Sequence, residues 1–130
     1  MADVEQGNRP LSPHLQIYKW PINMGMSIFH RVTGVAIGVV IAFVALWFFA
    51  LAWSPEAFAK ANWLMTSWLG WLVLFGGAVS LWFHFVNGLR HLVWDTGSSF
   101  GQKRVRRTAL IGLVFMVILT LVTIWVAVAV

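Results

Sequence analysis

The chain contains no cysteine and few charged residues. The absence of cysteine excludes disulfides, thiolate metal sites and cysteine nucleophiles. Charged residues make up 10% of the 130 positions, whereas a soluble domain carries about 25%. Hydrophobic residues make up 60%, which is more apolar surface than so small a globule can bury. These proportions exclude an ordinary soluble domain and indicate a protein that faces lipid or other membrane subunits.

Charges are also missing from three long segments. No acidic or basic residue falls between Arg31 and Glu56, between Lys60 and Arg90, or after Arg107, and these gaps are 24, 29 and 23 residues long. A spanning helix needs about 20 largely apolar residues, so each gap holds one span. We predict an all-α integral membrane protein, with three transmembrane helices in an up-down-up bundle. The predicted spans are residues 24–52, 61–91 and 108–130.

The remaining segments carry breaking and capping signals. Residues 1–23 form a polar leader with three prolines, which break regular helix, so the membrane domain is expected at residues 24–130. In the first link, Ser54 followed by Pro55 is typical of an N-cap and a first helical position. This pair predicts a short interfacial helix. The leader lacks the features of a signal or transit peptide, which favours a bacterial protein or a mature chain that has already been processed.

Basic residues are unevenly distributed among these segments. The leader carries Arg9 and Lys19, and the first link carries only Lys60. The second link carries a run of four: Lys103, Arg104, Arg106 and Arg107. Cytoplasmic loops are enriched in such residues. We therefore expect the N-terminus in the cytoplasm and the C-terminus outside, in a bacterial inner membrane. This signal explains the net charge of +5, so no nucleic-acid partner is expected.

Two polar clusters lie within the predicted spans, where polar residues are costly and often functional. Ser27, His30 and Arg31 share one face of the first span through their i, i+3, i+4 spacing. The second span carries a stripe spaced 4, 3 and 4 residues apart: Ser80, His84, Asn87 and His91. In an up-down topology both clusters lie near the same cytoplasmic surface. We expect them to form one site.

A neutral imidazole inside a membrane bundle is a good axial ligand for haem iron. Cations nearer the water could bind haem propionates, and a hydroxyl with a guanidinium could hydrogen-bond a quinone carbonyl. The residues alone leave other interpretations open. His84 could form a hydrogen bond across helices, and Arg31 and Arg90 could be snorkelling helix ends. Nothing in the sequence assigns a role to His14 or Asp95.

Three motifs resemble the cytochrome b membrane-anchor subunit of succinate dehydrogenase, respiratory complex II. They are Arg-Pro-Leu-Ser-Pro-His-Leu at 9–15, Ser-x-x-His-Arg-x-Thr-Gly at 27–34, and His-x-x-x-Gly-x-Arg-His-x-x-x-Asp at 84–95. The resemblance covers nearly the whole chain. It implies a subunit that pairs with a second small membrane anchor and holds an iron–sulfur subunit and a flavoprotein on the cytoplasmic face.

The resemblance also implies roles for single residues. His84 matches an axial ligand of one haem b, shared with the partner anchor, which supplies the second ligand. His30, Arg31 and His91 match positions near the haem propionates, while Ser27 and Arg31 match contacts of ubiquinone. The chain would then pass electrons from succinate to ubiquinone, within the respiratory chain and the tricarboxylic acid cycle. It is not an enzyme by itself.

Two other classes of function stay open at this point. One is a structural anchor of a related quinone oxidoreductase that binds no haem. The other is a small transporter or channel subunit in which the histidine of the second span relays protons.

Overall fold

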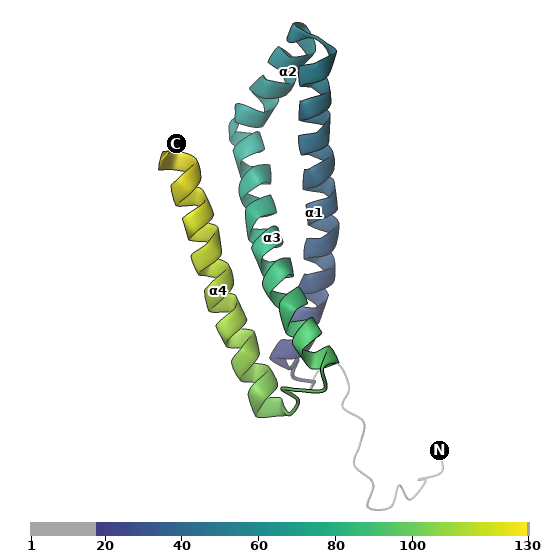
Figure 1. Ribbon diagram of the computed structural model, residues 1–130, viewed down its shortest axis with the longest axis vertical. Coiled ribbons are helices and arrows are strands. Elements are labelled where there is room, and N and C mark those ends of the chain that lie inside the picture. Colours follow the sequence, from purple (N-terminus) through teal and green to yellow (C-terminus); the bar gives the residue numbers. More distant parts are fainter. Residues whose placement is uncertain (1–17, 130) are drawn as a thin grey trace, which may run out of the picture.

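The computed structural model describes residues 18–129 of the chain. Four helices follow one another in these residues (Figure 1): α1 Ile22–Trp53, α2 Pro55–Thr66, α3 Trp68–Asp95 and α4 Gln102–Ala129. The helices α1, α3 and α4 are long and apolar enough to cross a membrane. They run up, down and up in Figure 1, with α3 packed against both neighbours. The predicted all-α membrane fold with three spanning helices is confirmed, and its completion by a partner stays a prediction.

The predicted cap at Ser54 is present and begins α2. Its hydroxyl oxygen accepts a hydrogen bond from the backbone N–H of Ala57 at 3.1 Å, and Pro55 is the first helical residue. However, α2 continues to Thr66 and takes up residues that the sequence assigned to the second span. The helix of that span therefore begins at Trp68 rather than near residue 61, where the sequence placed the start of the span.

The break between α2 and α3 has a local cause at Ser67. Its backbone is extended, with φ −68° and ψ 164°, and its hydroxyl oxygen accepts from the N–H of Gly70 at 3.2 Å. The same hydroxyl donates to the carbonyl of Leu64 at 2.6 Å. A side chain at Gly70 would run into the backbone carbonyls of the preceding turn. Ser67 and Gly70 together therefore make a corner, that is, a break between two helices inside an apolar segment.

The third spanning helix also begins earlier than the sequence predicted. It starts at Gln102 rather than residue 108, so the basic run lies on its first turns and not in a loop. Lysine and arginine are good helix formers with long side chains, so a helix can continue while their charges stay in water. The preceding turn uses three residues with positive φ: Gly97, Ser99 and Gly101. The first span starts at Ile22, two residues before the predicted position, and His14 lies outside the described residues.

The small core lies where the three long helices meet. Met26, Phe83 and Ala109 are buried, and most large apolar side chains are exposed, as expected of a surface that faces lipid. Farther along the bundle, α1 and α3 approach closely at Gly77. A Cβ there would lie 2.8 Å from the Cγ1 of Val40, so glycine permits the contact.

A buried arginine near the end of α3 links this helix to the start of α1 and the start of α4. Arg90 is 7% exposed. Its guanidinium donates to Asn23 Oδ1 at 2.8 Å, Thr108 Oγ1 at 3.2 Å, Asn87 Oδ1 at 3.3 Å and the carbonyl of Val105 at 3.2 Å. These acceptors come from α1, α3 and α4. The interpretation of Arg90 as a snorkelling end is wrong, because its charge is held inside the bundle.

Candidate functional site

One cavity gathers all the residues that the sequence nominated as cofactor-binding. It has a volume of about 350 Å³, and its lining consists of Ser27, His30, Arg31, His84 and His91. The first three lie near the start of α1 and the other two near the end of α3. These ends lie together at the bottom of Figure 1. The helical spacing within each span and the up-down topology therefore produce the arrangement that the sequence predicted.

The cavity is open on one side. Arg31 and His91 are exposed, whereas Ser27, His30 and His84 are half-buried. A group held here would touch this chain on one face only. Its other face would meet lipid or another protein.

The ring of His84 is fixed by the backbone of α1. Its Nδ1 lies 2.9 Å from the carbonyl oxygen of His30. A carbonyl only accepts hydrogen bonds, so Nδ1 carries the proton and, in the neutral ring, Nε2 carries the lone pair. The hydroxyl of Thr33 lies 3.4 Å from the same Nδ1 and donates to the carbonyl of Phe29 at 2.7 Å. The contact sets the tautomer that offers Nε2 as a ligand.

A glycine opposite this ring makes the contact possible. A Cβ built on Gly34 would lie 3.0 Å from Cε1 of His84 and 3.4 Å from its Nδ1. Any side chain at this position would press the imidazole away from α1. The sequence indicated Gly34 as part of a motif and as a glycine that lets helices approach closely, and in the fold the group that approaches it is the His84 ring. One turn later, a Cβ on Gly38 would meet nothing within 4 Å.

The imidazole of His30 lies between the two histidines of α3. Its ring centroid is 3.8 Å from that of His84, in an edge-on arrangement, and 5.3 Å from that of His91, in a stacked one. The Nδ1 of His30 is buried and has no hydrogen-bond partner among residues 18–129. A buried polar atom without a partner is costly. The site therefore holds a buried ring nitrogen next to His84 that could hydrogen-bond a bound group.

Only two of the four residues in the predicted polar stripe of α3 face the cavity. His84 and His91 line the cavity, but Asn87 is 3% exposed and hydrogen-bonded to Arg90 and to the carbonyl of Phe83. Ser80 is half-buried and does not line the cavity. Residues seven apart are nearly in register on a helix, whereas a step of three turns the side chain by about 60° from that line. Here this turn carries Asn87 into the helix interface.

Within residues 18–129, no group of three or more histidine or carboxylate side chains could hold a metal ion. The donor set therefore does not suit a bare metal bound by this chain alone. A single histidine with a free Nε2 suits one axial position of an iron already held by a porphyrin. The fold also adds two features that the site prediction lacked, namely the backbone carbonyl of His30 and the hydroxyl of Thr33.

Sequence comparison relates the chain to proteins of known class. Residues 5–123 match the family model described as "Succinate dehydrogenase/Fumarate reductase transmembrane subunit". The succinate dehydrogenase cytochrome b556 subunit of Paracoccus denitrificans is 42% identical over 129 residues, covering 97% of this chain and 99% of the relative. That of Rickettsia felis is 35% identical over 118 residues, covering 91% of each chain. The mitochondrial cytochrome b560 subunit of Sus scrofa is 33% identical over 113 residues, covering 85% of this chain and 67% of the relative.

The match extends over nearly the whole chain and includes all three spanning helices. It agrees with a multi-pass protein that carries a polar cavity at one end of the bundle. The chain belongs to the family of succinate dehydrogenase and fumarate reductase transmembrane subunits, the membrane anchors of complex II.

Proposed function

We propose that this chain is the haem b- and ubiquinone-binding membrane anchor subunit of a succinate dehydrogenase. It takes part in passing electrons from the iron–sulfur subunit to ubiquinone. One observation carries the proposal: the 2.9 Å contact between His84 Nδ1 and the His30 carbonyl, which leaves Nε2 available inside the cavity. The relatives support it, because they are named cytochrome b subunits.

The residues of the cavity fit a haem edge. His84 would supply one axial ligand through Nε2, and a second small anchor subunit would supply the other. When bound, haem supplies a carrier for single electrons. The His30 carbonyl keeps the imidazole oriented, as an outer partner of a metal-ligating histidine commonly does. His30, Arg31 and His91 would donate hydrogen bonds and positive charge to the propionates, and this would satisfy the buried Nδ1 of His30.

The quinone would bind at the rim of the same cavity. Ser27 is half-buried and can donate its hydroxyl proton to a quinone carbonyl. Arg31 is exposed at this rim and can place a cation beside the same oxygen as negative charge develops during reduction. These two residues are one turn apart on α1, so they can reach one carbonyl together.

The open side and the end of the bundle define where partners would bind. The second anchor subunit would cover the open face of the cavity. The iron–sulfur subunit and the flavoprotein would lie at the end where α1 begins and α3 ends. The basic run on the first turns of α4 favours the cytoplasmic side of a bacterial inner membrane for this end. The C-terminus would then lie outside.

Absorption spectroscopy of the complex purified through this chain tests the proposal. We expect a b-type α band in the dithionite-reduced minus oxidised spectrum, with loss of the band in His84→Ala. The matched control is Ser80→Ala, which changes a half-buried residue of α3 outside the cavity and should keep the band. A full band in His84→Ala would refute the ligand assignment. A wild-type complex without any band would favour the haem-free anchor.

A further inference from the structure

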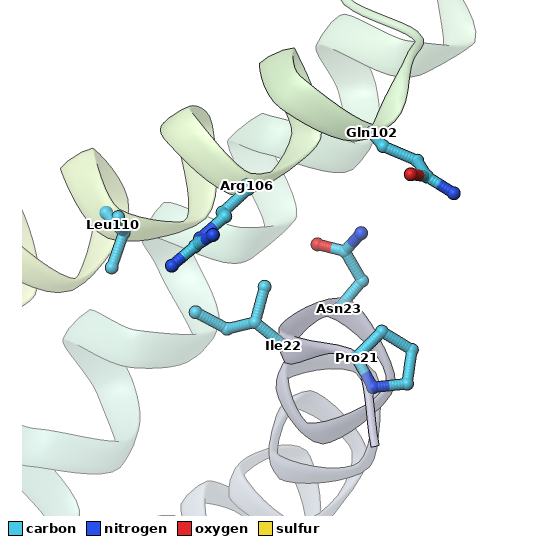
Figure 2. Close-up of a pocket in the computed structure, with 6 residues that line it drawn as sticks. All are labelled: Pro21, Ile22, Asn23, Gln102, Arg106 and Leu110. Carbon is cyan, nitrogen blue, oxygen red and sulfur yellow. The ribbon is translucent and has the colours of Figure 1, made fainter. Parts of the chain in front are cut away.

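A second groove lies between α1 and α4, apart from the histidine cavity. It consists of two cavities that share Pro21 and Ile22. The first, of about 600 Å³, lies where both helices begin, and Figure 2 shows its lining: Pro21, Ile22, Asn23, Gln102, Arg106 and Leu110. The second, of about 410 Å³, continues along the apolar part of the bundle. Neither shares a residue with the histidine cavity.

The first cavity has the chemistry of an anion site. Figure 2 shows Arg106 of α4 and Asn23 of α1 on opposite sides of it. Arg106 is exposed, and no acidic residue lines the space. Arg90 donates to Asn23 Oδ1 at 2.8 Å, so the Asn23 amide can direct its N–H donors elsewhere. The first turns of α4 add the positive end of a helix dipole.

The second cavity has the chemistry of a hydrocarbon site. Beyond Trp20, Pro21 and Ile22 it is lined only by Gly25 and apolar side chains from three helices: Met26, Phe29, Phe83, Leu113 and Met116. Its polarity therefore changes along its length, from a cationic end at the membrane surface to an apolar end inside the span. A free anion would satisfy only the first part, and a hydrocarbon only the second.

We propose that this groove binds one anionic phospholipid. The phosphate lies between Arg106 and Asn23, and one acyl chain follows the apolar cavity between α1 and α4. Basic pockets between transmembrane helices bind anionic headgroups in this manner. The site is independent of the haem and quinone assignments, because it uses the opposite face of α1.

Native mass spectrometry of the delipidated complex tests this proposal, with dioleoylphosphatidylglycerol and dioleoylphosphatidylcholine as probes. The wild type should bind one phosphatidylglycerol about tenfold more tightly than phosphatidylcholine, because both lipids offer the same phosphate but the choline ammonium would bring a second cation beside Arg106. Arg106→Gln should lose this preference. The matched control is Arg104→Gln, which removes the same charge from the same turn but does not line the groove. It should change the affinity less than about twofold.

A third variant tests the acyl chain separately from the headgroup. Gly25 lines the apolar cavity, and a Cβ there would meet nothing within 4 Å. Gly25→Leu should therefore fill the groove without disturbing the helices and should weaken the binding of both lipids. Unchanged binding in Gly25→Leu would overturn the acyl-chain placement. Equal losses in Arg106→Gln and Arg104→Gln, or equal affinity for both lipids in the wild type, would overturn the headgroup site.

Discussion

Replacement of Gly34 by alanine tests whether the position of His84 depends on its contact with α1. A methyl group at Gly34 would lie 3.0 Å from Cε1 of His84, where ordinary van der Waals contacts begin at 3.4 Å. The ring must then yield by a few tenths of an ångström. Metal–ligand distances tolerate only about 0.2 Å. The substitution therefore displaces the proposed ligand beyond this tolerance and strains its bond to the His30 carbonyl.

The expected consequence is weaker haem binding. Loss of an outer partner of a ligating histidine typically lowers metal affinity by about 10- to 100-fold. We expect Gly34→Ala to lower the haem content of the purified complex by a factor in this range, measured as α-band absorbance per flavin. Gly38→Ala is the matched control, because its methyl group would meet nothing within 4 Å. Both substitutions gain about 1 kcal/mol of helix propensity, so this effect cancels.

Two outcomes would refute this reasoning. If Gly34→Ala keeps the haem content of the wild type, the orientation of His84 does not depend on space at Gly34. If Gly38→Ala loses as much haem as Gly34→Ala, the loss comes from general disturbance of α1 and not from the His84 contact.

Further predictions concern the quinone and the helix ends. Ser27→Ala and Arg31→Leu should each lower succinate:ubiquinone reductase activity by about tenfold, since each removes one hydrogen bond to developing charge, whereas succinate oxidation by an artificial acceptor stays within about twofold. Equal loss of both activities would contradict a quinone role. Arg90→Leu should leave the side-chain and backbone acceptors of α1, α3 and α4 without their donor. We expect it to lower the free energy of unfolding by about 3–5 kcal/mol, measured as reduced assembly and a lower melting temperature. Arg90→Lys should recover part of this stability, because a lysine can satisfy some but not all of these acceptors, and wild-type stability in Arg90→Leu would contradict the role of the network.

The parts of the structure that the sequence predicted well are those set by short-range periodicity. The i, i+3, i+4 spacing of Ser27, His30 and Arg31 determines a shared face on any helix. The alternation of three apolar spans then brings His84 and His91 to the same end of the bundle. Both steps need only the helical period and the direction of each span, so the sequence alone sufficed.

The features that the sequence did not reveal depend on contacts between distant residues, or on a local hydrogen bond that overrides the apolar pattern of a segment. The burial of Arg90 depends on an acceptor 67 residues away, Asn23, which the sequence placed in the leader. The corner at Ser67 was missed because the apolar pattern runs through it, while a hydroxyl–backbone bond breaks the helix. Asn87 is turned by about 60° from the line of His84 and His91, and in the helix interface it accepts a hydrogen bond from Arg90.

Chemical rescue of His84→Gly by imidazole tests the central claim most directly, because it replaces only the proposed ligand. The variant removes the imidazole from the cavity beside Gly34, and free imidazole can fill the space that it leaves. We predict that the reduced-minus-oxidised spectrum of the His84→Gly complex lacks the α band and that millimolar imidazole restores it. A full band in this variant without imidazole would contradict the assignment of His84 as a haem ligand.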